Sequence, residues 1–222
     1  KIMPFLLLIN TFVLGQDVPA KDISIADELK KYTRAVWRGT EGDNLNYCYR
    51  GPDKIAPGKK YPLLFYLHGS GGRGNDNKGQ LLDANGLEAF AEQEIFTKHS
   101  SYVFAGQVPK GERWVDVAWN ALEHSMPPVS NFMELALEAL DAFVANKEHQ
   151  VDPNRIYVMG LSMGGYGTWD AIQRRPQYFA AAVPICGGGD MALAPTLVNM
   201  PIWIWHGDQD NSIKVSRSRD MA

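Results

Sequence analysis

Residues 155–169, RIYVMGLSMGGYGTW, place a Gly-x-Ser-x-Gly pattern between an apolar, strand-like run and a helix-like segment. A tight turn from a strand into a helix has no room for large side chains, which explains the glycines at 160 and 164 on either side of Ser162. Such a turn exposes the serine oxygen, and the next backbone N–H, that of Met163, lies beside it at the positive end of the helix. We therefore predict that Ser162 is a nucleophile. The alternative is a purely structural Gly-Ser turn.

The segments around this turn alternate between strand-like and helix-like patterns. Apolar runs that end near glycine predict buried strands at 61–69, 101–107, 155–160 (after a turn at 151–155), 180–189 and 200–207. Residues 34–38 and 45–50 predict an antiparallel pair. Apolar residues at helical spacing predict a helix over 130–147, and a second helix is expected from just after Ser162 to about Arg174. The alternation predicts an α/β fold with a mainly parallel central sheet and helices on both faces.

Ligands bind at the carboxyl ends of the strands in such sheets, and a glycine-rich stretch follows the first long strand. This stretch is HGSGGRGND, residues 68–76. Its glycines allow backbone N–H groups to point inward, and acyl transfer needs such donors for the oxyanion. We assign the donors of an oxyanion hole to the backbone N–H groups of Ser70 and Met163. Gly71 is the alternative to Ser70, and an ordinary glycine loop is the non-catalytic alternative.

A second polar stretch, IWIWHGDQD at 202–210, ends a late strand. A carboxylate at this position can orient a base and stabilise its charged form. Asp208 and Asp210 both qualify by residue type, and their spacing does not choose between them.

Five stretches together resemble the α/β-hydrolase superfamily: YPLLFYLHGSGGRGND, GQVPKGERWVDVAW, VDPNRIYVMGLSMGGYGTWDAI, FAAAVPICGGGD and PIWIWHGDQD. Within it, the chain is similar to secreted carboxylesterases of the phospholipase/carboxylesterase-like group (the predicted peptidases), to feruloyl and acetylxylan esterases and to polyhydroxybutyrate depolymerases. The resemblance spans about residues 40–220. It implies the α/β-hydrolase fold, with Ser162 as the nucleophile and Asp210, the last residue of an H-G-x-x-D pattern, as the acid.

The resemblance also implies a chain order of nucleophile, acid and then histidine, yet all 5 histidines precede Asp210. They are His68, His99, His124, His149 and His206. We expect His68 and His206 to brace loops, and His99 and His149 to be solvated. The loop that holds His124 could reach the site, but chain order disfavours it as the base. We therefore expect the catalytic histidine beyond the chain end, in a C-terminally truncated domain that lacks a final strand, the histidine loop and a closing helix and is inactive as a fragment.

The loop after the fourth expected strand, residues 106–119, is rich in tryptophan and charge. Trp114 and Gln107 are candidates for a substrate pocket, with Gln107 near the oxyanion site. The alternative is that Trp114 covers core. No cofactor is expected, because the sequence has no dinucleotide or phosphate-loop pattern, and no metal is expected because its His and Cys residues lack ligand spacing.

The first residues, KIMPFLLLINTFVLG at 1–15, combine a basic start, an apolar run and a small residue. We predict a signal peptide there, a hydrolase domain over 16–222, and a secreted or periplasmic protein. A buried N-terminal strand or helix is the alternative, and the run is too short for a stable membrane span. Cys48 and Cys186 are expected to be buried thiols.

The net charge of −3 and the absence of charge runs give no reason to expect a nucleic-acid partner. The leading interpretation is a secreted serine carboxylesterase that acts on a small ester or on acyl groups of plant polysaccharide, the substrates that the resemblance implies. A serine peptidase on the same fold is the runner-up. A non-catalytic binding domain is the third possibility.

Overall fold

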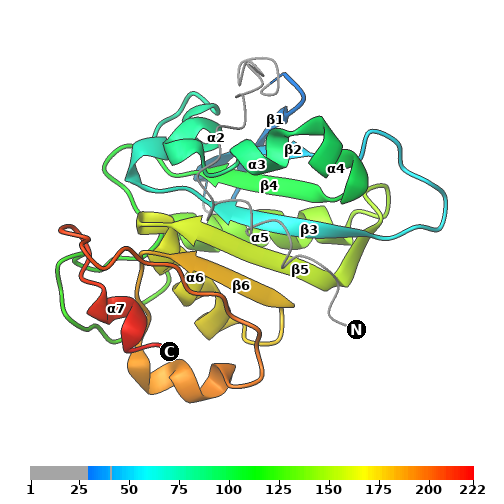
Figure 1. The fold of residues 1–222 in the computed structure, drawn as a ribbon. Coiled ribbons are helices and arrows are strands. Elements are labelled where there is room, and N and C mark those ends of the chain that lie inside the picture. The colour runs from blue at the N-terminus through cyan, green and yellow to red at the C-terminus, as the bar shows by residue number, and fades with distance from the viewer. Residues whose placement is uncertain (1–29, 41) are drawn as a thin grey trace, which may run out of the picture.

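The computed structural model describes residues 30–40 and 42–222. The expected signal peptide at 1–15 lies outside the described residues. The core of the structure is a six-stranded sheet with the order β1-β2-β4-β3-β5-β6 (Figure 1). The strands are β1 (Thr33–Arg38), β2 (Asn44–Arg50), β3 (Tyr61–Leu67), β4 (Tyr102–Gln107), β5 (Val151–Leu161) and β6 (Ala181–Ile185). β1, β2 and β4 pair antiparallel, whereas β4, β3, β5 and β6 pair parallel, which confirms the predicted mixed but mainly parallel sheet.

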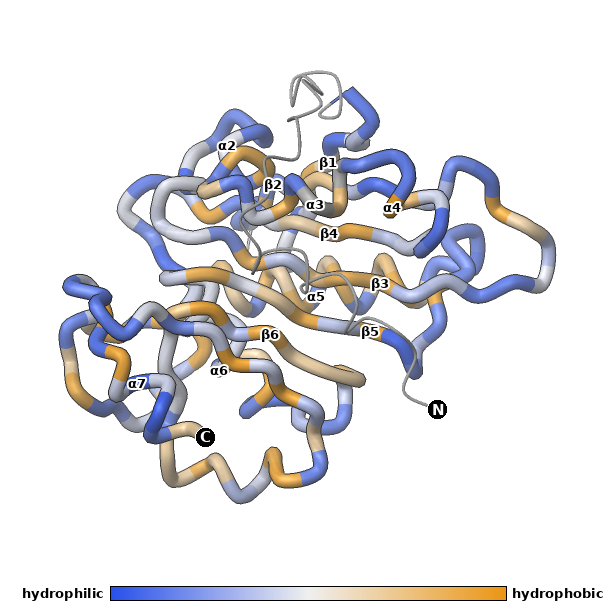
Figure 2. Tube along the Cα trace, in the orientation of Figure 1, coloured by the Kyte–Doolittle hydropathy of each residue, from blue (hydrophilic) through white to orange (hydrophobic). Residues whose placement is uncertain are grey.

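Helices cover both faces of this sheet. α5 (Asn131–Ala145) and α6 (Met163–Arg174) contribute to the larger hydrophobic core on one face. The short helices α2 (Gly79–Leu82), α3 (Glu88–Ala91) and α4 (Gln93–Lys98) cover the other face, where Leu81, Leu87 and Phe96 join a second core cluster. Figure 2 shows the hydrophobic residues gathered along the strands and the hydrophilic ones in the outer loops. The fold is therefore the layered α/β architecture that the sequence predicted.

The expected helices agree closely with α5 and α6. α5 begins after Ser130, whose hydroxyl accepts the N–H of Met133 as an N-cap. The remaining helical segments are short: η3 (Ser70–Gly72), η4 (Asp83–Asn85), η5 (Met191–Leu197) and α7 (Ser216–Arg219). No helix in the described part of the chain is both long and apolar enough to cross a membrane.

Two strand boundaries differ from the sequence prediction. β5 begins at Val151, which pairs with Tyr61 before a shift of register, so the expected turn at 151–155 is an irregular part of the strand. The expected strand at 200–207 is reduced to two isolated bridges to β6, at Ile202 and Trp205. Pro184 explains the interruption: it accepts from the N–H of Trp205 but has no N–H to return to this segment.

The carboxyl ends of the parallel strands lie at the left of Figure 1, at the end of the sheet where α6 begins. Cys48 is buried and Cys186 is half-buried, and both are free thiols. The candidate site residues from the sequence lie at this edge of the sheet: Gln107 ends β4, Met163 begins α6, and the others lie in the segments that follow the strands.

Candidate active site

Ser162 occupies a strained turn between β5 and α6. Its φ of 55° and ψ of −116° are rarely adopted by a residue with a side chain. The neighbouring glycines explain how the turn closes. A Cβ at Gly160 would lie 2.3 Å from the carbonyl oxygen of Gly164, and a Cβ at Gly164 would lie 1.8 Å from that of Leu67. The turn therefore has the geometry of a nucleophile elbow, in which backbone packs directly on backbone.

The elbow sits between the ends of β3 and β6. The N–H of Ser162 donates to the carbonyl of Ile185, the last residue of β6, at 2.8 Å. A Cβ at Gly165 would lie 2.3 Å from the same carbonyl oxygen. On the other side, Gly164 packs against the backbone of Leu67 and His68. The structure thus brings the elbow and the start of the glycine-rich loop 68–76 together, as the sequence predicted from the ends of the strands.

The imidazole of His68 braces this loop. Its side chain is fully buried, Val108 donates its backbone N–H to Nε2 at 3.0 Å, and Nδ1 lies 2.6 Å from the carbonyl oxygen of Gly69. Because Nε2 accepts, Nδ1 carries the proton and donates to Gly69. Burial lowers the pKa of His68 to about 4, so the ring is neutral at physiological pH. Both nitrogens are occupied, which suits the bracing role expected for His68.

Gln107 lies against the same loop from β4. Its side-chain N–H donates to the carbonyl of Gly72 at 3.1 Å and to Asp76 Oδ1 at 2.7 Å, and its amide oxygen accepts the N–H of Asn77 at 2.7 Å. The N–H groups of Gly79 and Gln107 lower the pKa of Asp76 to about 2. Gln107 is 1% exposed, so the structure places it beside the candidate oxyanion loop as a support for that loop.

Trp114 is also fully buried. Its indole N–H donates to the carbonyl of His68 at 3.0 Å, and its ring lies against Gly167 of α6. These are the contacts of a core residue, the alternative that the sequence left open. A pocket wall would need an exposed face, which Trp114 does not present in this structure.

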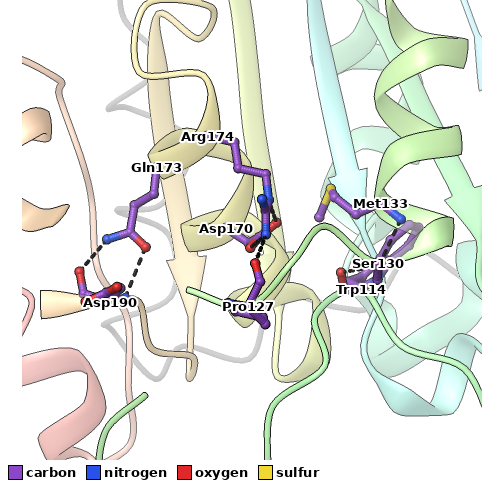
Figure 3. A network of polar contacts seen from close by, with 8 residues as sticks. All are labelled: Trp114, Pro127, Ser130, Met133, Asp170, Gln173, Arg174 and Asp190. Atoms are coloured by element: carbon purple, nitrogen blue, oxygen red, sulfur yellow. Dashed lines mark hydrogen bonds and ion pairs between the residues drawn. The ribbon is translucent and has the colours of Figure 1, made fainter. Parts of the chain in front are cut away.

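The loop that contains Trp114 is fastened to α5 and α6 (Figure 3). Arg174 forms two hydrogen bonds with Asp170, at 2.7 and 2.9 Å, and donates to the carbonyl of Pro127 at 2.7 Å. Ser130 donates to the carbonyl of Trp114 at 2.7 Å. Gln173 and Asp190 form a further reciprocal pair in the same view. The helix that begins at the elbow therefore also fixes this loop, through Arg174 at its other end. The sequence analysis did not identify Asp170 and Arg174, although their i, i+4 spacing on a helix is a recognisable ion-pair pattern.

The turn at 207–213 distinguishes the two candidate acids. Asp210 Oδ1 accepts the N–H groups of Ser212 at 2.8 Å and Ile213 at 3.0 Å, whereas Asp208 is exposed. Burial raises the pKa of Asp210, but these N–H donors and the nearby His206 outweigh it and lower the pKa below its ordinary value. Asp210 also interacts electrostatically with Cys186, the residue that follows β6 beside the elbow. These contacts distinguish Asp210 from Asp208, and the role of Asp210 as the acid stays a prediction.

His206 braces the acid turn, as expected. Its Nδ1 lies 2.7 Å from Ser218 Oγ, its Nε2 lies 2.9 Å from the carbonyl oxygen of Ile213, and Asp210 Oδ2 is 3.5 Å away. Arg217 donates a hydrogen bond to Nδ1 of His124. His149 is not the solvated residue that we expected, because its ring stacks on Phe143 with centroids 3.8 Å apart.

Among the described residues, no histidine forms a hydrogen bond with Ser162. The same part of the chain contains no cluster of His, Cys, Asp and Glu suited to a metal ion. A cavity of about 410 Å³ lies elsewhere, at the amino ends of β3 and β5, where it is lined by Pro62 and Tyr157. The candidate site is therefore defined by the elbow, the glycine-rich loop and the acid turn.

Comparisons with known proteins agree with the fold described above. Residues 102–221, more than half of the chain, match the Prolyl oligopeptidase family (Peptidase_S9), and the chain belongs to this family. Poly(3-hydroxyalkanoate) depolymerase C of Paucimonas lemoignei is 43% identical over 151 residues, which are 68% of this chain and 33% of that protein. Poly(3-hydroxybutyrate) depolymerase of Ralstonia pickettii is 27% identical over 127 residues, 56% of this chain and 25% of that protein.

Among solved structures, a thermostable esterase superimposes with a TM-score of 0.80 at 33% identity, covering 87% of this chain and 51% of that one. The chain thus spans a third or less of the two depolymerases and about half of the esterase. These matches show an α/β-hydrolase fold of the type found in esterases and depolymerases, which confirms the predicted superfamily and fold class.

Proposed function

We propose that this chain carries the nucleophile and the acid of a serine hydrolase that cleaves carboxylic esters. The observation that carries the proposal is the backbone of Ser162, held at φ 55° and ψ −116° by glycines at 160 and 164 that admit no side chain. Strain of this kind persists only where the surrounding structure enforces it, and it gathers at active sites.

In the proposed reaction, a base removes the proton of Ser162 Oγ as this oxygen attacks the ester carbonyl. The backbone N–H groups of Ser70 and Met163 hold the oxyanion of the tetrahedral intermediate. The alcohol then leaves, and water releases the acid from the acyl-enzyme. Asp210 orients the base and stabilises its charged form. We propose that this base is a histidine outside the described residues.

The substrate class that we propose is a carboxylic ester with a small or hydroxycinnamoyl acid, including acetyl and feruloyl esters of plant polysaccharide. The names of the two depolymerases add poly(3-hydroxyalkanoates) to this set. A panel of acetyl, feruloyl and 3-hydroxybutyryl esters, assayed at equal concentration, ranks these acyl groups by their rate of hydrolysis.

A serine peptidase is the second candidate, and the match to the Prolyl oligopeptidase family favours it. The two activities share every residue named above and differ in the leaving group. Matched ester and anilide substrates that share one acyl group separate them. We expect hydrolysis of the ester and little of the anilide, whereas comparable rates on both would favour the peptidase.

The test uses the natural protein that contains this chain, with the substitutions Ser162→Ala and, as a control, Ser100→Ala. Ser100 lies after α4 and bonds only to the carbonyl of Thr97 in the described structure. We expect Ser162→Ala to lower kcat by about 10³-fold or more, and to abolish labelling by a fluorophosphonate probe, while Ser100→Ala changes neither. Full activity in Ser162→Ala would overturn the proposal. Correct folding with no labelling of the unmodified protein would instead favour a binding domain.

We also propose that the natural protein is exported, on the pattern of residues 1–15. The test is the N-terminal sequence of the mature protein. A start at Gln16 supports export, and an intact N-terminus contradicts it.

A further inference from the structure

Asp83 is a carboxylate that the proposed reaction does not use, and it lies against the glycine-rich loop. It opens η4, directly after α2. A Cβ at Gly69 would lie 2.8 Å from Asp83 Oδ2, and a Cβ at Gly71 would lie 2.3 Å from Oδ1. Only residues without a side chain at 69 and 71 leave room for this carboxylate. Both of its oxygens therefore face the turn that contains Ser70.

The segment around Asp83 is held in an unusual conformation. Ala84 and Asn85 follow with positive φ values of 48° and 55°. The chain then reaches Gly86, where a Cβ would lie 2.0 Å from the hydroxyl oxygen of Tyr66 in β3 and 3.2 Å from a methyl carbon of Leu161. Two consecutive left-handed residues without glycine are costly, so packing must enforce them. The result is a turn pressed against β3, β5 and the candidate oxyanion loop together.

The polar environment of Asp83 matches this placement. Oδ2 is buried and forms no hydrogen bond in the described part of the chain. Burial raises the pKa of the carboxyl, and the backbone N–H groups of Gly69 and Gly72 oppose that rise. The titratable group that faces Asp83 from β3 is the Tyr66 hydroxyl. Burial raises the pKa of Tyr66, and the charge of Asp83 raises it further. The carboxylate thus fills the space beside Gly69 and Gly71, and the nearby N–H groups of the loop favour its charged form.

We propose that Asp83 is a positioning residue, whose carboxylate holds the turn at 69–72 so that the Ser70 N–H points at the reacting carbonyl. The inference rests on the proposed function for its catalytic consequence. Donors of an oxyanion hole act only when they are preorganised, so a small displacement of this turn lowers kcat more than it alters substrate binding. Asp83 touches no reacting atom and acts through the loop.

The first arm of the test measures the contact itself. In the natural protein labelled with ¹⁵N-glycine, the amide shifts of Gly69 and Gly72 are followed from about pH 3 to 8. We expect both to titrate with one midpoint above about 3.9, the ordinary value for Asp. In Asp83→Asn this titration is lost, whereas it is retained in the control Asp220→Asn, a change at an exposed residue of the last turn. Glycine amides that do not titrate in the unmodified protein would overturn the inference.

The second arm measures catalysis on an ester. We expect Asp83→Asn to lower kcat by about 10- to 100-fold, with KM changed by less than about threefold, because one misplaced donor costs less than its removal. Gly71→Ala supplies a second route, since its Cβ displaces the same carboxylate. The double variant should lose little more than either single one. An unchanged kcat in folded Asp83→Asn would overturn the inference. In a protein that hydrolyses no ester, the proposed function fails, and the glycine titration still decides whether Asp83 holds the loop.

Discussion

The elbow at Ser162 and the turn at Asp210 form the two halves of the candidate site, and they are held in place by different forces. At the elbow, glycine backbone lies against the carbonyl oxygens of Leu67 and Ile185 with no room for a methyl group. At the acid turn, the side chains of Asp210 and His206 form the hydrogen bonds that close residues 206–213. Steric contacts fix the first half, and polar contacts fix the second.

The difference predicts how each half responds to change. Backbone packed on backbone cannot relax around an added atom, so the elbow tolerates only glycine at positions 160 and 164. The hydrogen bonds of the Asp210 and His206 side chains can be removed one at a time, and those that depend on the charge of Asp210 respond to pH. We therefore expect Ser162 to be held more rigidly than Asp210.

The largest effect should come from matched glycine substitutions in the two halves. Gly164→Ala places a Cβ 1.8 Å from the Leu67 carbonyl oxygen, whereas a Cβ at Gly207 has nothing within 4 Å. We expect Gly164→Ala to lower the free energy of unfolding by about 3 kcal/mol or more, and Gly207→Ala to change it by less than about 1 kcal/mol. Urea unfolding monitored by tryptophan fluorescence measures both. Equal effects would contradict the contrast between the two halves.

The same contrast explains what the sequence could predict. The elbow was predictable because the glycines that it requires stand at a fixed spacing around Ser162, between a strand pattern and a helix pattern. The choice between Asp208 and Asp210 was not predictable from residue type, because it depends on which carboxylate accepts the N–H groups of Ser212 and Ile213. Steric requirements restrict the sequence locally, whereas polar networks are set by the tertiary fold.

Tertiary context also decided the remaining differences. The apolar run at 200–207 reads as a strand, but Pro184 in the neighbouring strand cannot donate to it, and only two bridges form. The sequence allows Trp114 to be either a pocket wall or a core residue, and the hydrogen bond from its indole N–H to the His68 carbonyl places it in the core. Asp83 carries no local pattern at all. Its proximity to Gly69 and Gly71 follows from the strained turn at 84–85, which the sequence does not reveal.

An intermediate effect is expected at His206 in the acid turn. The substitution His206→Ala removes the contacts of both ring nitrogens, with Ser218 and with Ile213, from a side chain that is only 3% exposed. We expect a loss of about 1 to 3 kcal/mol in the free energy of unfolding. His99→Ala is the control, because the ring of His99 forms no hydrogen bond within the described structure. A loss in His206→Ala no larger than in the control would show that the ring does not brace the turn.

The smallest effect should be the most informative about the acid, because it depends on pH. The pKa of Asp210 is lower in the folded protein than its ordinary value of about 3.9. Its charged form therefore stabilises the fold above pH 3.9, and this contribution is lost as the pH falls through the lower, folded pKa. Asp210→Asn cannot titrate and, with a side chain that is 21% exposed, should cost about 1 kcal/mol at pH 7. Urea unfolding of both proteins at several pH values should show this difference shrinking from about pH 5 downward. A difference that stays constant to pH 2 would mean that the carboxylate charge does not hold the turn, and the polar half of the site would then depend on His206 alone.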